Sequence, residues 1–186
     1  MKHIATVALM LNLGVAGVYA QDRPVMMTFS GTAAASTINL GTGTPTSEYN
    51  FGGDGALGPF TFRTVSAGAA SPQQSSTCPS PKLYFPAIAG AGVFRFQDGS
   101  LLKVHLTQGS DCIDLAALQA VCIRAFQITG GTGRFKDASG MVTFTETLMP
   151  VVADANNNPV FFAVTGEVTG TISGVAIGDE GQDARR

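Results

Sequence analysis

The sequence predicts an all-β domain: a closed antiparallel barrel of about eight strands, with long Gly/Ser/Pro-rich loops and no significant helix. Two observations lead to this prediction. Runs rich in Thr, Val and Phe alternate apolar and polar residues, which is the period-two pattern of strands, and glycine-rich turns separate them. The runs are mostly joined as hairpins, and none has a convincing helical pattern. A sandwich fits the same pattern, but a closed barrel removes the liability of edge strands.

The chain divides into three predicted parts, residues 1–20, 21–176 and 177–186. The first part resembles a signal peptide, because a short basic start precedes an apolar run and the small-x-small sequence Val18-Tyr19-Ala20. Its apolar run of about 15 residues is shorter than the ~20 needed to span a bilayer. We therefore expect an exported protein, secreted or periplasmic, with a barrel domain and a charged, disordered tail.

The composition argues against two classes of partner. Only 13% of residues are charged and the formal net charge is −2. Such a chain lacks the basic surface that binds nucleic acid or an anionic membrane, so we expect no nucleic acid and no membrane after cleavage. No cofactor is expected either.

The predicted strands follow one another with two long interruptions. Residues 36–57 and 66–81 are predicted as loops because Gly, Ser, Thr, Asn and Pro dominate them. Asp98-Gly99 between two strand-like runs predicts a hairpin. Asp114–Leu118 is expected to form one helical turn. The predicted strands are Val25–Ala35, Gly58–Val65, Leu83–Phe85 (ending at Pro86), Gly92–Phe96, Leu101–Gln108, Cys122–Thr129, Met141–Leu148 (ending before Pro150) and Val160–Ser173.

Three cysteines, Cys78, Cys112 and Cys122, leave one unpaired if a disulfide forms. The connection between Cys112 and Cys122 is short, so loop-closure entropy favours that disulfide. Cys78 in the second long loop is the competing partner for either. A zinc site is not expected, because the spacings do not match and His105 is the only histidine after residue 20.

A glycine-rich stretch, I-T-G-G-T-G-R-F-K-D-A-S-G from Ile128 to Gly140, joins two predicted strands. Three glycines in four positions cannot lie inside a helix or a strand, so the backbone there needs positive φ or close approach. We expect Thr132 to Phe135 to make a tight turn and Phe135 to close the barrel end. A phosphate-binding loop is not expected, because the Gly-Lys-Ser/Thr ending and the following helix are missing.

The run G-G-T-G-R-F-K-D-A-S-G resembles the G-G-T-G-(K/R)-F-x-x-A-x-G corner of the dirigent and allene oxide cyclase barrel superfamily. Gly92 to Phe96, Asp98-Gly99-Ser100 and Val164 to Ser173 are similar to exported bacterial members of that group. The resemblance implies a closed eight-stranded barrel and a homo-oligomer, a trimer or a dimer. The plant enzymes convert a fatty-acid epoxide or steer the coupling of phenoxy radicals inside the barrel. The matched motif is structural, so it assigns no catalytic residue here.

Two charged residues interrupt the apolar faces of the strands on either side of this corner. Arg124 lies on the face with Cys122, Phe126 and Ile128, and Glu146 lies on the corresponding face of Met141–Leu148. A charge on an apolar face is costly unless it is paired, so we expect the two to meet in the barrel interior. The pair either orients a ligand's polar group or serves as a structural or interface ion pair.

Two further residues, Tyr84 and Arg95, are candidate ligand-binding residues of the interior, whereas His105 is expected on the surface. No catalytic constellation is recognisable. Two function classes follow. The first is a non-catalytic exported barrel that binds a small apolar ligand or a protein partner. The second is an allene oxide cyclase-like isomerase or a dirigent-like guide of radical coupling.

Overall fold

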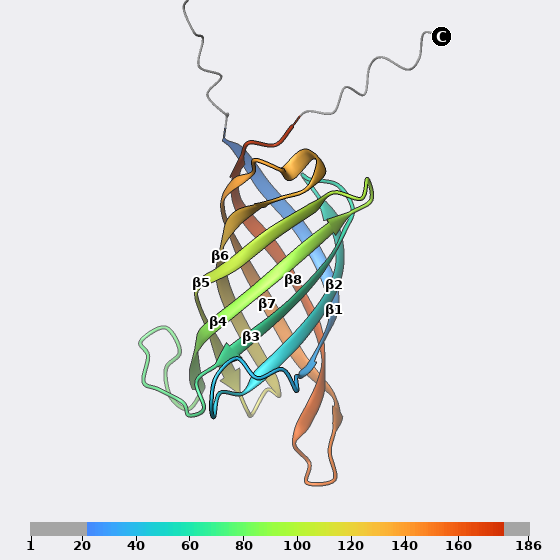
Figure 1. The fold of residues 1–186 in the computed structure, drawn as a ribbon. Helices are drawn as coiled ribbons and strands as arrows, with labels where there is room; N and C mark the ends of the chain where they lie inside the picture. Colours follow the sequence, from blue (N-terminus) through green and yellow to red (C-terminus); the bar gives the residue numbers. More distant parts are fainter. Residues whose placement is uncertain (1–21, 177–186) are drawn as a thin grey trace, which may run out of the picture.

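The computed structural model describes residues 22–176, so the predicted signal peptide (1–20) and tail (177–186) lie outside the described residues. The described chain forms eight strands and one 3-10 turn (Figure 1). Apart from that turn the described residues contain no helix, and therefore none that could cross a membrane. The elements are β1 (Arg23–Ala35), β2 (Thr46–Gly55), β3 (Phe60–Gly68), β4 (Leu83–Phe96), β5 (Leu101–Asp114), β6 (Gln119–Gly131), η1 (Gly133–Phe135), β7 (Ser139–Ala153) and β8 (Pro159–Ser173).

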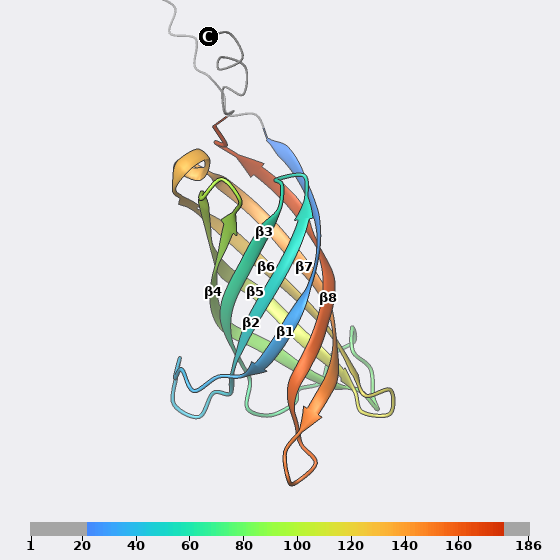
Figure 2. The same cartoon turned by 90° about the vertical axis from the view of Figure 1, so that its right-hand side faces the viewer.

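The eight strands close into a barrel in chain order. Each strand pairs antiparallel with the next, and β8 pairs with β1, with Arg23 opposite Ile172 at one end of that ladder. The strands tilt steeply around the barrel axis, and the β7–β8 hairpin projects beyond its lower rim (Figures 1 and 2). The predicted fold class is confirmed, and the hairpin through Asp98-Gly99 joins β4 to β5.

One predicted loop is wrong, because residues 36–57 contain β2. Its Tyr49 and Phe51 point inward and are buried, while Glu48 and Asn50 are exposed. The glycines of this segment made it look like a loop. Packing nevertheless requires a glycine at position 53, because a Cβ added to Gly53 would lie 2.2 Å from the Thr28 carbonyl oxygen. Close backbone approach therefore explains a glycine inside a strand.

Two prolines do not end their strands as predicted. β4 runs through Pro86, which lies opposite Ser110, and β7 runs through Pro150, which lies opposite Phe162. Pro86 has no N–H to donate, but its carbonyl oxygen accepts a hydrogen bond from Ala69 at 2.9 Å. Residues 115–118 form a turn in place of the expected helical turn.

The barrel interior is packed with aromatic rings. Interacting centroids lie between 4.3 and 6.2 Å apart, the range of favourable aromatic pairs. Val168 and Ile172 on β8 add to this core and are fully buried. Nine of the twelve phenylalanines take part, namely Phe29, Phe51, Phe60, Phe62, Phe94, Phe96, Phe126, Phe135 and Phe144.

The two ends of the barrel differ, and we name them by their contents. The corner end carries η1, where Phe135 is fully buried against Phe96 with ring centroids 4.7 Å apart. Gly130 and Gly133 there have φ of 98° and 57°, which confirms the predicted need for positive φ. The mouth end carries the loops 36–45, 69–82, 115–118 and 154–158.

The disulfide joins Cys78 to Cys112, with 5.6 Å between their Cα atoms, and Cys122 is a buried free thiol. The predicted Cys112–Cys122 pairing is wrong. Cys112 lies opposite Val121 on the outer face of the barrel, whereas Cys122 points inward from the next strand. Neighbouring residues of a pleated sheet face opposite sides, so a short connection does not bring these two sulfurs together. The bond holds the loop 69–82 to the outside of β5.

Candidate binding site at the mouth of the barrel

A polar cluster lies below the phenylalanine core, built from inward positions of four strands. Tyr49 comes from β2, Asp111 from β5, Arg124 from β6 and Glu146 from β7. Cys122 pairs with Asp111 on one side and with Glu146 on the other, so the ladder brings both carboxylates next to β6. The predicted meeting of Arg124 and Glu146 in the interior is confirmed.

The Arg124 guanidinium is the centre of the cluster. Its Nη1 donates to Glu146 Oε2 at 2.6 Å, and its Nη2 donates to both Tyr49 Oη and Asp111 Oδ1 at 2.7 Å. Its Cζ also lies 4.8 Å from the centroid of the Tyr49 ring, in cation–π contact. The Arg124 Nε–H is buried and has no hydrogen-bond partner among the described residues.

Burial makes these interactions strong and the charges costly. Arg124 and Glu146 are each 2% exposed, whereas the Asp111 side chain is 26% exposed. One cation faces two carboxylates, so the cluster has one negative charge more than it can pair. A buried pair of this kind depends on every partner being present.

Burial in the cluster changes the protonation of Glu146. Burial raises the pKa of Glu146 to about 7, with Asp111 adding to the effect and Arg124 opposing it. Burial also raises the pKa of the Tyr49 hydroxyl above its ordinary value and that of the Cys122 thiol well above its own. Tyr49 and Cys122 therefore stay neutral at physiological pH, while Glu146 exchanges a proton near neutrality.

A small cavity of about 170 Å³ opens beside this cluster at the mouth end. Tyr49, Asp111 and Arg124 line one side of it. Apolar side chains of β3, β4 and β5, among them Phe85 and Ile113, line much of the remainder. We call this space the mouth cavity; its other lining residues are Pro45, Ser47, Ser66, Ala67, Gly68, Ala69, Ala70 and Ala87. This volume is smaller than a pocket for a drug-sized ligand and is enough for one aromatic ring.

Two polar atoms of the cluster are free to serve a ligand in the mouth cavity. The Tyr49 oxygen accepts a hydrogen bond from Arg124, which leaves its O–H proton for another acceptor. Asp111 uses Oδ1 for Arg124 and also interacts with the Cys122 thiol, but no hydrogen bond to Oδ2 is formed within residues 22–176, so Oδ2 is an acceptor for a ligand. The site therefore offers one donor and one carboxylate acceptor beside apolar walls, the combination that orients a single hydroxyl group, which both accepts and donates.

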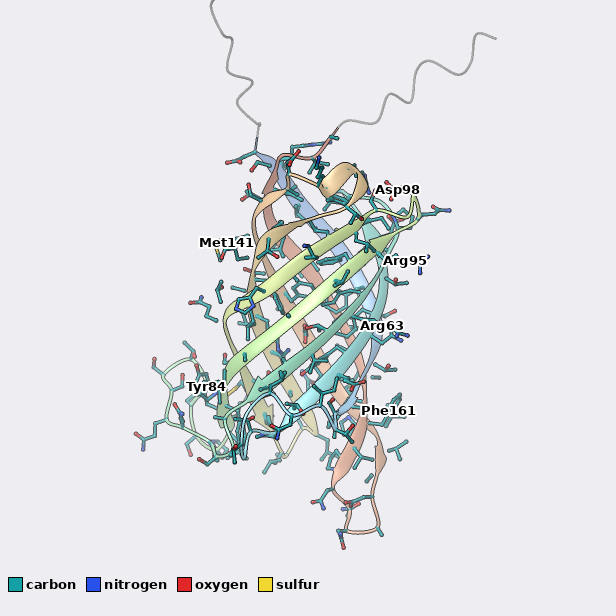
Figure 3. All side chains as sticks on the ribbon, in the orientation of Figure 1. Arg63, Tyr84, Arg95, Asp98, Met141 and Phe161 are labelled. Carbon is teal, nitrogen blue, oxygen red and sulfur yellow. A yellow bond between two sulfur atoms is a disulfide. The ribbon has the colours of Figure 1, made fainter. Side chains whose placement is uncertain are left out.

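The four predicted site residues separate into two groups. Arg124 and Glu146 lie together at the mouth. Tyr84 and Arg95 do not lie in the interior as expected, because Phe85 and Phe94 take the inward positions beside them. Tyr84 lines a separate outer cleft beside the Cys78–Cys112 disulfide, and Arg95 points to solvent (Figure 3).

Sequence reasoning missed Tyr49 and Asp111. Tyr49 lies in the segment predicted as a loop, although the alternation of Tyr49 and Phe51 was a usable signal. Asp111 gave no such signal. Counting by twos from the inward Leu106 places Asp111 outside, but a bulge between Leu106 and Gln108 reverses the faces.

Among residues 22–176, no group of three or more His, Cys, Asp or Glu side chains is placed to hold a metal ion.

Comparison with known proteins identifies similar structures but no sequence relative. No family model and no curated protein matches the sequence. The pterocarpan synthase dirigent protein GePTS1 has a similar structure, with a TM-score of 0.39 and 12% identity over 89% of this chain and 99% of that one. PsPTS1, also a pterocarpan synthase dirigent protein, has a TM-score of 0.37 and 12% identity, over 81% of this chain and 96% of that one.

Proposed function

We propose that this protein is an exported barrel that binds a small, mainly apolar molecule carrying one polar oxygen at the mouth cavity. The observation that supports this most is the Arg124 cluster. Arg124 is fixed by three oxygens at the edge of a cavity, while the Tyr49 proton and Asp111 Oδ2 remain uncommitted. Phenylalanine side chains fill the barrel interior, so we expect the ligand to bind at the mouth end and not deep inside the barrel.

The ligand's polar group is bound as follows. A hydroxyl group on the ligand donates to Asp111 and accepts from Tyr49, and its apolar body lies against Phe85 and Ile113. Arg124 positions both protein groups, since its Nη2 contacts Tyr49 and Asp111 at once. The sequence also left open a protein partner and a purely structural ion pair. Neither alternative gives a role to the Tyr49 hydroxyl proton or to Asp111 Oδ2.

Phenol is a suitable first probe, because it combines a flat apolar ring with one hydroxyl group. We expect phenol to bind and to shift the NMR signals of Ala87 and Ile113. Asp111→Asn and Tyr49→Phe should each weaken binding by roughly tenfold, the effect of losing one hydrogen bond to a charged or polar partner. Tyr84→Phe is the matched control, since Tyr84 lies outside the mouth cavity. Toluene binding as tightly as phenol would contradict the polar role of the cluster.

A second candidate, a dirigent-like or cyclase-like activity, is favoured by the protonation of the same cluster. Glu146 has a pKa of about 7 beside Arg124 and a partly exposed Asp111, and acid–base sites separate the pKa values of neighbouring groups in this way. The glycine-rich corner motif also resembles that of the dirigent and allene oxide cyclase superfamily. Two assays test this candidate: coupling of a methoxyphenol by an added one-electron oxidant, and cyclisation of an unsaturated fatty-acid epoxide. Racemic product in both would rule it out.

Export to an oxidising compartment is supported by the Cys78–Cys112 disulfide, because such bonds persist mainly outside the reducing cytosol. A homo-oligomer, a dimer or a trimer, stays a prediction. Light scattering of the purified chain tests it.

A further inference from the structure

A second concave site lies on the outside of the barrel, away from the mouth cavity. It is a groove of about 770 Å³ over the outer faces of β1 to β6. Of the mouth residues Tyr49, Asp111 and Arg124, only Tyr49 also lines it. Its floor over β3 and β4 is made of the short apolar side chains Val65, Ala91 and Val93. We call it the outer groove.

The strand register explains how its basic residues are arranged. Arg63 of β3 pairs with Val93 of β4, and Val93 pairs with Lys103 of β5, so two cations flank one valine in a single row. Strands lie about 4.8 Å apart, so the Cα atoms of Arg63 and Lys103 are roughly 10 Å apart, and both long side chains can reach over Val93. The next row places Ala91 between Val65 and His105.

These cations have no internal partner. Arg63 and Lys103 are exposed and form no ion pair within residues 22–176, where every salt bridge involves Lys82, Arg124 or Arg134. The chain as a whole is slightly acidic. Figure 3 shows Arg63 and Arg95 on the outer surface, and Arg95 lies outside the groove. Glu48 is the one acidic residue of the lining, on the far side of Val65 from Ala91.

We propose that the outer groove binds a small amphipathic carboxylate. The carboxylate lies over Val93 between Arg63 and Lys103, and a compact apolar body covers Ala91 and Val65. Guanidinium groups bind carboxylates in a planar, two-bond geometry, and lysine adds a second positive charge. Val93, at 39% exposed, and its short neighbours form an apolar floor that a flat body can cover.

The choice of ligand follows from the combination of features. A simple anion would not use the apolar floor, and an uncharged apolar molecule would leave both cations unused. The exposed position makes the attraction sensitive to salt. This inference does not rest on the function proposed for the mouth cavity. Tyr49 lines both spaces, but the residues assigned here to the carboxylate and its apolar body, Arg63, Lys103, Val93, Ala91 and Val65, do not line the mouth cavity.

The experiment uses 4-tert-butylbenzoate as the probe, with the full chain, isothermal titration calorimetry and NMR. We expect saturable binding that weakens as salt rises, with shifted signals at Ala91 and Val93. The uncharged isostere 4-tert-butylbenzamide and the bare head group acetate should each bind at least roughly tenfold more weakly.

Variants of exposed residues locate the site without threatening the fold. Arg63→Gln and Lys103→Gln together should weaken the benzoate at least roughly tenfold, whereas Arg95→Gln, a loss of charge on the same outer face, should leave it unchanged. Absence of binding would overturn the proposal. Equal weakening by Arg95→Gln, shifts confined to Ala87 and Ile113 at the mouth, or binding to anionic vesicles without binding of the free benzoate would also overturn it.

Discussion

The two ends of the barrel each use one arginine against aromatic rings, and the two arginines are set in opposite surroundings. At the corner end, Arg134 lies over Phe96 and Phe135, with its Cζ 4.9 and 4.6 Å from their centroids. Its Nη2 donates to the Leu57 carbonyl oxygen, and its Nε lies 3.0 Å from Asp98 Oδ2, although the N–H is not aimed well enough for a hydrogen bond. The Arg134 side chain is 30% exposed.

At the mouth end, Arg124 is buried and faces more negative charge than it can neutralise. The comparison separates two tasks. Arg134 fastens a packed end, where water still stabilises the charge. Both arginines have a buried Nε–H without a hydrogen-bond partner, but Arg124 is itself buried beside two carboxylates and a cavity, where water does not stabilise its charge. Unfinished polar networks of this second kind are costly for stability and are typical of sites that act on a ligand.

The largest expected effect is the loss of Arg124. Arg124→Leu leaves Glu146 buried without its cation, and we expect the free energy of unfolding to fall by about 3–5 kcal/mol. Urea unfolding followed by circular dichroism measures it. The double variant Arg124→Leu, Glu146→Leu should recover most of the loss, because no isolated buried charge remains. If Arg124→Leu and Glu146→Leu are each as stable as the parent, the pair contributes nothing.

A smaller effect is expected from pH. The pKa of Glu146 is about 7 in the folded state and near 4.5 in the unfolded state. The folded state therefore keeps its proton over a range where the unfolded state has lost it, and the Glu146 contribution to stability falls as pH rises from about 4.5 to 7. Each pKa unit corresponds to about 1.4 kcal/mol, so the full change is on the order of 3 kcal/mol.

The midpoints of urea unfolding at pH 5 and pH 8 measure this slope, the change of stability with pH. Glu146→Gln should flatten it, because the amide does not titrate. A parent protein that is equally stable at both pH values, or a variant with an unchanged slope, would show that Glu146 does not hold the proton.

The smallest effect is expected at the corner end. Arg134→Leu removes a partly exposed ion pair and two cation–π contacts, each worth about 1 kcal/mol or less, so we expect a loss of roughly 1–2 kcal/mol. High salt should reduce this difference, whereas the Arg124 effect should change little, since buried pairs are weakly screened. A loss as large as that of Arg124→Leu would remove the distinction between the two ends.

The corner and the mouth also differ in how far the sequence predicts them. The corner is local: glycines with positive φ and the buried Phe135 lie within one short segment, so the residue pattern is sufficient. The meeting of Arg124 and Glu146 was predictable because a charge on an apolar strand face requires a partner.

The rest of the site depends on non-local geometry. Asp111 faces the cluster only because a bulge in β5 turns its side chain from the outer face to the inner face. No residue pattern in the sequence predicts that bulge. Tyr49 belongs to a strand whose Gly53 is required by contacts with Thr28 and Phe29 of β1 and with Phe60 of β3, and these contacts are not visible in the local residue pattern. The disulfide was mispredicted for a similar reason, because sequence spacing says nothing about the face on which Cys112 lies.

Because β1 pairs with β8, the start of β1 and the end of β8 lie side by side at the corner end, where Arg23 is opposite Ile172. The described chain thus enters and leaves the barrel through the same end, as Figure 1 shows. The mouth cavity lies at the opposite pole. An immobilising linker or a fused reporter can therefore be attached at the start of β1 or at the end of β8. The mouth then faces away from the attachment point, so the barrel can be mounted on a surface with its candidate site unobstructed.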